Sequence, residues 1–146
     1  MDCEIAVNKI KEICTNSSNV LKDVVDFLHE TFDHYSWIGI YLVEGDDLVL
    51  GPWRGANSTE HVRIPIGQGI CGSAVATKKT EVIADVHSDS RYLSCFISTK
   101  SEIVAPIMKN GKVLGEIDID SDKKSAFTKE DKEFLERVAD MLNEHI

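Results

Sequence analysis

The sequence predicts an α+β domain in which helices cover one face of a mainly antiparallel sheet and loops roof a ligand pocket on the other. Three observations predict it: helical periodicity at both ends of the chain, short apolar runs separated by turns between them, and a hairpin pattern at 101–121. Helices and strands do not alternate strictly, which argues against a parallel α/β sheet. At 146 residues, the chain suits one domain over 1–146.

Residues 3–14 and 20–32 are predicted to form two amphipathic helices, with an N-cap for the second within 16–18. Aliphatic residues of the second helix recur at helical spacing: Leu21, Val24, Val25 and Leu28. This periodicity is typical of a helix that packs one face on a core. We expect both helices to cover the aliphatic face of the sheet.

The chain closes with a third predicted helix. Thr128 with Asp131 forms a variant of the capping box, and an apolar face follows over 134–142. The loop before it, 122–127, is charged. We expect this helix to lie on the same face of the sheet as the first two.

Residues 37–43 are predicted to form a strand whose two faces differ. One face is aliphatic, whereas the other carries Trp37, Gly39 and Tyr41. Two aromatic rings on either side of a glycine leave a gap that suits a small ligand. The alternative is that both rings are ordinary core residues.

The middle of the chain contains shorter predicted strands and two polar loops. Strands are expected at 47–51, 62–64 and 80–84, with a functional loop at 52–61 and an irregular segment at 85–99. Cys95 lies on that second loop, where a cysteine is less readily explained by packing.

The stretch 67–73 (GQGICGS) is predicted to be a glycine loop that enters a short helix at 74–77. It lacks the lysine of a P-loop and the full dinucleotide fingerprint, which excludes both motifs. The loop places Cys71 near a helix N-terminus, where the backbone dipole favours the thiolate and lowers the thiol pKa. The alternative is a small buried thiol.

The hairpin at 101–121 is centred on Asn110-Gly111, a strong hairpin signal between apolar runs. In its second strand, Glu116, Asp118 and Asp120 alternate with isoleucines and therefore share one face. An acidic row of this kind, with another carboxyl nearby, suits the floor of a polar pocket.

The turn decides whether Glu102 joins that row, because a slip of one residue reverses every side chain. A two-residue turn pairs Ile103 with Asp118 and puts Glu102 on the opposite face. A three-residue loop, 109–111, sets Glu102 directly across from Asp118. We predict the three-residue loop and hence one shared acidic face.

The net charge is −9 and the basic residues are scattered, which argues against nucleic acid and anionic membranes as partners. No apolar run approaches the ~20 residues that a membrane span needs, and the first residues do not resemble a signal peptide. A cytoplasmic protein is therefore expected. The cysteines form no CxxC pair, which argues against zinc; Cys3 and Cys14 are predicted to be structural.

Several stretches resemble a GAF domain and, more closely, the free methionine-(R)-sulfoxide reductases built on it. They follow the family's order along most of the chain: 37–41 (WIGIY), 48–52 (LVLGP), 62–65 (VRIP), 69–72 (GICG), 82–87 (VIADVH), 101–104 (SEIV) and 115–121 (GEIDIDS). The glycine–cysteine stretch and the final hairpin are fairly specific together, whereas each alone also occurs in GAF sensor domains.

The resemblance implies a chemistry and a set of residues. A cysteine thiolate attacks the sulfur of free methionine sulfoxide and becomes a sulfenic acid, which a second cysteine converts to a disulfide that a thioredoxin-type reductant clears. By position, Cys95 matches the attacking cysteine and Cys71 a potential partner. The matching substrate-binding residues are Glu102, Asp118, Asp120, Trp37 and Tyr41. No cofactor is implied, and a homodimer is compatible with the family.

Two positions depart from the family pattern. The family commonly has a cysteine just before the Val-Arg-Ile-Pro stretch, where this chain has His61. The family motif usually continues with an aspartate after the attacking cysteine, where this chain has Phe96. The first change removes a usual resolving cysteine, so Cys71 or an external thiol would have to resolve. Both changes favour the rival hypothesis of a GAF module that binds a small cationic ligand without catalysis.

Overall fold

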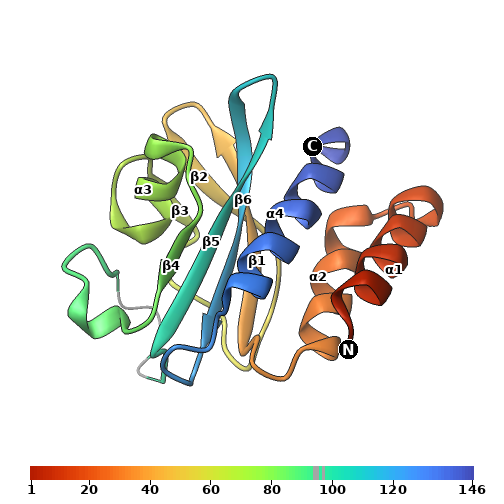
Figure 1. Cartoon of the computed structure of the whole chain (residues 1–146). Coiled ribbons are helices and arrows are strands. Elements are labelled where there is room, and N and C mark those ends of the chain that lie inside the picture. The colour runs from red at the N-terminus through yellow and green to blue at the C-terminus, as the bar shows by residue number, and fades with distance from the viewer. Residues whose placement is uncertain (94–95, 97) are drawn as a thin grey trace.

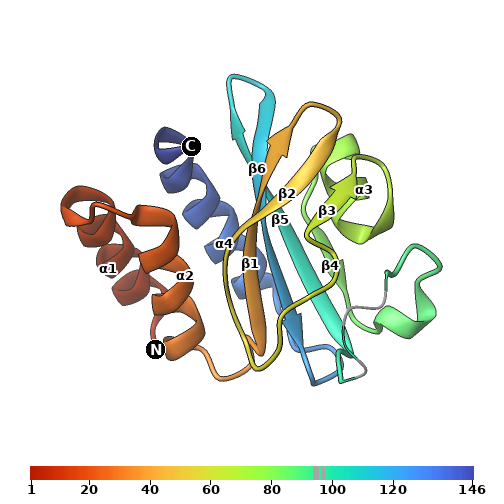
Figure 2. The ribbon, with the colours of Figure 1, turned by 180° about the vertical axis from the view of Figure 1, so that it is seen from behind.

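The computed structural model describes residues 1–93, 96 and 98–146, and it places one antiparallel sheet between two unequal helical layers (Figure 1). Three long helices cover one face of the sheet, and the short helix α3 lies on the other (Figures 1 and 2). The helices are α1 (Cys3–Asn16), α2 (Val20–Thr31), α3 (Gly69–Thr77) and α4 (Lys129–Leu142). The short turns η1 (Val86–Ser88) and η2 (Asn143–His145) are 3-10 helices. The strands are β1 (Trp37–Glu44), β2 (Asp47–Arg54), β3 (Arg63–Pro65), β4 (Glu81–Ile83), β5 (Ser101–Lys109) and β6 (Lys112–Ser121).

The predicted helices are confirmed, with differences at their ends. The α1 helix begins after Asp2, whose carboxylate accepts hydrogen bonds from two backbone N–H groups of its first turn. The N-cap of α2 is Asn19, not a residue within 16–18. Thr128 and Asp131 form the complete capping box of α4.

The described strands are ordered β3-β2-β1-β6-β5-β4, and all neighbouring pairs are antiparallel. The strand β2 runs to Arg54, so the prediction of a loop beginning at Pro52 was wrong. Its last residues continue to pair with β1, across a register shift between Gly39 and Tyr41.

The predicted three-residue loop between β5 and β6 was wrong. Lys109 pairs with Lys112 across a two-residue turn, in which both Asn110 and Gly111 have positive φ. A bulge between Ile107 and Met108 then shifts the register by one residue. Glu102 therefore pairs with Asp120 instead of Asp118, but it still shares the acidic face.

The two faces of the central strands have opposite characters. The aliphatic face packs on α1, α2 and α4 in one core, and Ile38, Ile103 and Ile119 are fully buried there. The other face carries the aromatic and acidic side chains and packs on α3 and on neighbouring loops. This separation confirms the predicted placement of the terminal helices.

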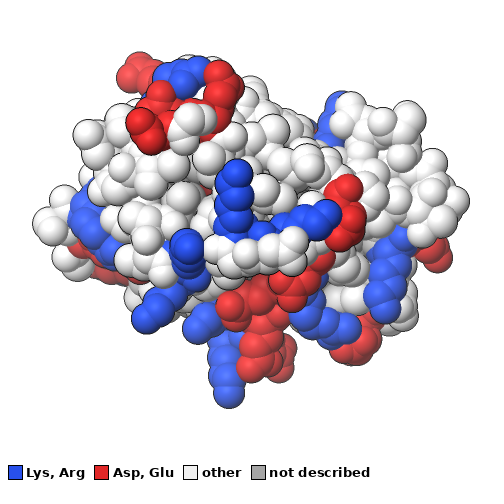
Figure 3. All heavy atoms as spheres, turned by 90° about the horizontal axis from the view of Figure 1, so that it is seen from above, with Lys and Arg blue, Asp and Glu red and all other residues white. Residues whose placement is uncertain are grey.

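The charged surface is mixed where it can be seen. On the face in Figure 3, Lys and Arg side chains lie among Asp and Glu side chains. Within the described residues, no helix is long and apolar enough to cross a membrane.

Candidate active site

Three strands bring the predicted site residues together through their pairing. Trp37 of β1 pairs with Asp120 of β6, and Tyr41 pairs with Glu116. On the other side of β6, Asp120 pairs with Glu102 of β5. Since side chains of paired residues point to the same face, the aromatic and acidic residues form one continuous surface.

The four carboxyl groups on this surface are buried. Glu116 is fully buried, and the exposed fractions of Glu102, Asp118 and Asp120 are only 4–5 %. Buried carboxyls are ordinarily paired with a cation or hydrogen-bonded donors. Among the described residues, both oxygens of Glu116 and one oxygen each of Asp118 and Asp120 have no hydrogen-bond partner.

This environment raises the pKa of all four carboxyls. Burial is the largest cause in each case, because it disfavours the charged form. The negative charge of Asp118 further raises the pKa of Glu102, Glu116 and Asp120. Ionisation of all four groups together is therefore disfavoured.

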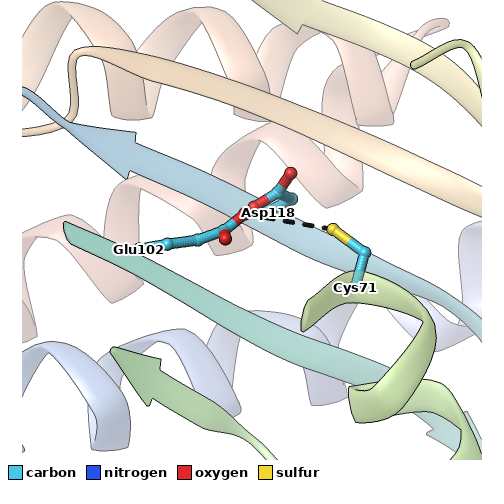
Figure 4. Close-up of side chains that lie close together, drawn as sticks. All are labelled: Cys71, Glu102 and Asp118. Atoms are coloured by element: carbon cyan, nitrogen blue, oxygen red, sulfur yellow. Dashed lines mark hydrogen bonds between the residues drawn. The ribbon is translucent and has the colours of Figure 1, made fainter. Parts of the chain in front are cut away.

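Cys71 lies against this acidic surface. Its sulfur is 4.0 Å from an Oε of Glu102, and Figure 4 shows the thiol pointing from α3 toward Glu102 and Asp118. The helix begins at Gly69 and not at residue 74 as predicted, so Cys71 lies in its first turn. A Cβ on Gly72 would lie 2.8 Å from the carbonyl oxygen of Pro65, so glycine lets α3 pack this closely on its entry loop.

The prediction of a lowered pKa for Cys71 was wrong. Burial raises the pKa of this thiol well above its ordinary value, and the charges of Asp118, Glu116 and Glu102 raise it further. The helix dipole favours the thiolate, but the effect is too small to offset burial among carboxylates. Cys71 is a neutral thiol in this state.

Aromatic rings form the wall beside the carboxyls. Trp37 stacks on Trp53 with ring centres 6.3 Å apart, and its ring centre lies 5.9 Å from that of Phe96. The hydroxyl of Tyr41 donates a 2.7 Å hydrogen bond to the backbone oxygen of His61. The loop that carries His61 is thereby held over the acidic surface.

Two cavities adjoin this surface. The larger, of about 310 Å³, is lined by Trp37, Phe96 and Asp120 among others, and its size suits an amino acid. The smaller, of about 20 Å³, is lined by Tyr41, His61, Cys71, Glu102 and Asp118 among others. All predicted site residues that the structure describes therefore line one of two adjacent cavities.

Cys95 and Glu116 differ from the other site residues in how they were predicted or described. Cys95, the predicted attacking cysteine, lies outside the described residues. Glu116 was seen in the acidic row of the sequence but was not included among the predicted site residues. The strand alternation that it shares with Asp118 and Asp120 was the signal that could have included it.

Comparisons with known proteins agree with this architecture. The GAF domain family matches residues 16–146. The free methionine-R-sulfoxide reductase of Escherichia coli is 40 % identical over 115 residues, which cover 79 % of this chain and 68 % of that protein.

Solved structures resemble the chain over nearly its whole length. A type II free methionine-R-sulfoxide reductase from Thermoplasma acidophilum is 38 % identical, with a TM-score of 0.82 over 97 % of this chain and 92 % of that one. A free methionine-R-sulfoxide reductase from Neisseria meningitidis, solved in complex with its substrate, is 31 % identical, with a TM-score of 0.91 over 97 % and 86 %.

Proposed function

Because the chain belongs to the GAF-domain free methionine-R-sulfoxide reductase family, we propose that it reduces free L-methionine (R)-S-oxide to L-methionine. The observation that carries this proposal is the buried row of carboxyls beside a thiol and an aromatic wall. Burial of such a row lowers the stability of the fold unless the carboxyls bind a cationic ligand or hold protons, and such groups are typical of functional sites.

In this proposal, the substrate occupies the larger cavity, which Trp37 and Asp120 line, and extends along the acidic surface toward the side chains that line the smaller one. Its ammonium group pairs with carboxylates of the Glu102, Asp118 and Asp120 set, and its S-methyl group packs against Trp37 and Tyr41. Methionine sulfoxide within a peptide lacks that ammonium group. The acidic surface therefore selects the free amino acid.

Cys95, by its position in the family motif, supplies the attacking thiolate. The thiolate attacks the sulfoxide sulfur and forms a transient sulfur–sulfur bond, and a proton is transferred to the oxygen. The sulfur–oxygen bond of the substrate then breaks as the oxygen passes, as a hydroxyl group, to the cysteine sulfur, and the transient sulfur–sulfur bond breaks with it. The products are methionine and the Cys95 sulfenic acid, so methionine sulfoxide is reduced by two electrons and Cys95 is oxidised by two.

The proton comes from the acidic surface. Burial raises the pKa of Glu102, Asp118 and Asp120, so that one of them holds a proton near neutral pH while the others remain available to the ammonium group. The same carboxylate, once deprotonated, can accept the proton of Cys71 in the next step.

Cys71 resolves the sulfenic acid. It forms a sulfur–sulfur bond with Cys95, and the oxygen leaves as water after it receives the Cys71 proton. A thioredoxin-type dithiol then exchanges with the disulfide and returns both thiols. We infer a cytoplasmic location, because such a cycle needs a reducing compartment.

The R and S epimers of free methionine sulfoxide, each with dithiothreitol, test the proposal through the methionine that is formed. We expect methionine from the R epimer alone. We also expect Cys95→Ser to abolish turnover, and Cys71→Ser to permit one turnover but to stall recycling by thioredoxin. Cys14→Ser is the matched control, since this half-buried thiol packs beside the helical core, on the opposite side of the sheet.

Methionine production by Cys95→Ser at the wild-type rate would contradict the assignment of Cys95 as the nucleophile. A folded protein that forms no methionine from either epimer would favour a ligand-binding GAF module. In that case, a thermal-shift screen with small cationic ligands would be the next experiment.

A further inference from the structure

The smaller cavity between α3 and the acidic surface is too small for an amino acid. Its volume of about 20 Å³ exceeds the ~10–15 Å³ that one water molecule requires, but it leaves no room for a larger group. Its lining residues include Cys71, Glu102, Asp118 and His61. Among the described residues that line it, there is no Lys or Arg.

The donor atoms of this cavity are spaced almost as a metal ion requires. One atom each of Cys71, Glu102 and Asp118 lies within 4.8 Å of the other two, and all three residues are buried (Figure 4). Around a tetrahedral zinc ion, with Zn–S about 2.3 Å and Zn–O about 2.0 Å, ligand atoms are about 3.3–3.5 Å apart. The donor atoms, up to 4.8 Å apart, therefore have to move closer together when zinc binds.

An independent observation also indicates a cation at this place. One carboxylate oxygen of Asp118 has no hydrogen-bond partner among the described residues, although the residue is only 5 % exposed. Glu116, on the same face, has two such oxygens and is fully buried. A divalent cation bound at the three donors would compensate the buried carboxylate of Asp118, since its binding displaces protons from the thiol and the carboxyls.

His61 adds the donor type that zinc favours most alongside thiolate. Its backbone is fixed at both ends, because its N–H donates to Thr59 Oγ1 at 3.0 Å and its carbonyl accepts from Tyr41. Its charge also lowers the pKa of Asp118, which reflects the proximity of the two side chains. A cysteine and two carboxylates form a zinc-type donor set, and His61 lines the same cavity beside them.

We propose that Cys71, Glu102 and Asp118 bind one zinc ion in the smaller cavity, beside His61, and that the zinc-bound protein is inactive. The inhibition rests on the proposed function, because zinc would hold the resolving thiol and two of the substrate-binding acids. The expectation of no zinc site came from the lack of a CxxC pair. These donors come from three separate elements, so no local spacing in the sequence indicates them.

Cobalt(II) is the probe for this site, because it replaces zinc and reports a thiolate ligand through a charge-transfer absorption in the near ultraviolet. The metal-free, reduced protein is titrated anaerobically with Co²⁺ in the presence of a phosphine reductant. We expect the absorption to saturate at one equivalent and to disappear when Zn²⁺ is added. No thiolate absorption in the wild-type protein would overturn the proposal.

Matched variants assign the ligands. We expect Cys14→Ser to retain the absorption and Cys71→Ser to lose it. We also expect Cys71→Ser to lower the affinity for zinc more than ~100-fold. Loss of a residue that contacts a metal ligand, but not the metal itself, lowers metal affinity by only about 10–100-fold. Asp118→Asn provides a second test that keeps the shape of the site, and we expect it to weaken zinc binding as well. Retention of the absorption in Cys71→Ser would contradict the assignment.

The consequence for activity is measured separately. In a single turnover by the pre-reduced protein without dithiothreitol, which would itself bind zinc, one equivalent of zinc should abolish methionine formation by the wild-type protein, and a chelator should restore it. Full activity of the zinc-loaded protein would overturn the inhibitory role. If the protein forms no methionine at all, the proposed function fails, while the cobalt absorption still decides whether the metal site exists.

Discussion

The two faces of the same strands differ in how their buried groups are satisfied. On the helical face, Ile38, Ile103 and Ile119 pack against other apolar side chains. The carboxylate of Asp131 on that side accepts hydrogen bonds from Tyr35 and from the backbone of Thr128. On the acidic face, carboxyl oxygens are buried with no such partners among the described residues. The first face stabilises the fold, whereas we propose that the second binds the substrate.

The largest expected effect is on the helical face. Ile119→Ala removes a fully buried side chain between two acidic residues of β6, and it should lower the free energy of unfolding by about 2–5 kcal/mol. Urea denaturation measures this loss. Reductase activity per folded molecule should stay within a few-fold of wild type, and a loss of activity without a loss of stability would break the distinction between the faces.

Substitution of the neighbouring residue on the acidic face should weaken substrate binding but leave stability intact. Asp120→Asn keeps the shape of the side chain but removes its charge, and it should weaken binding of the free amino acid by about 1–3 kcal/mol. Stability should not fall, because the substitution neutralises a buried carboxyl of which one oxygen has no hydrogen-bond partner among the described residues. Unchanged substrate affinity in calorimetry would remove Asp120 from the binding site.

A partnered carboxylate provides the next comparison. Burial opposes ionisation of Asp131, but hydrogen bonds from Thr128, His34 and Tyr35 outweigh it and hold its pKa below the usual range. Asp131→Ala should lower the free energy of unfolding by about 0.5–2 kcal/mol at neutral pH. Since the folded pKa is lowered, this contribution is present above the unfolded pKa of ~3.9 and is lost as the pH falls further.

The pH dependence is checked by urea denaturation at pH 7 and at pH 3, with Asp140→Ala, an exposed position on the same helix, as the control. A difference between Asp131→Ala and wild type that persists undiminished at the lower pH would mean that ionisation of Asp131 does not contribute.

The smallest effect should come from Glu116. Glu116→Gln replaces a fully buried carboxyl whose oxygens have no hydrogen-bond partner within hydrogen-bonding distance among the described residues, and it should raise the free energy of unfolding by about 0.5–1 kcal/mol. Glu60→Gln, at an exposed loop position, should change nothing measurable. A clear loss of stability in Glu116→Gln would show that its charge has a stabilising partner.

Much of this contrast could be predicted from the sequence. Period-two alternation alone separates the isoleucines from the acids of β6, and helical periodicity places the terminal helices. The register could not be predicted, because the bulge between Ile107 and Met108 depends on how β5 packs in the finished sheet. The shorter turn shifts the register by one residue and the bulge shifts it by one more, so Glu102 remains on the predicted face.

The state of Cys71 could not be predicted for a related reason. The sequence indicates a helix N-terminus but not the depth at which it is buried, and burial decides the pKa of the thiol. The proximity of Cys71, Glu102 and Asp118 likewise depends on α3 packing against the sheet.

The central claim is that the acidic face recognises the ammonium group of a free amino acid. The most direct measurement compares the turnover of free L-methionine (R)-S-oxide with that of its N-acetyl derivative, in which an uncharged amide replaces the ammonium group. We predict that the free amino acid is reduced and that the N-acetyl derivative is reduced at least ~10-fold more slowly, as expected from a binding loss of about 1.4 kcal/mol or more. Equal turnover of both compounds would contradict the claim.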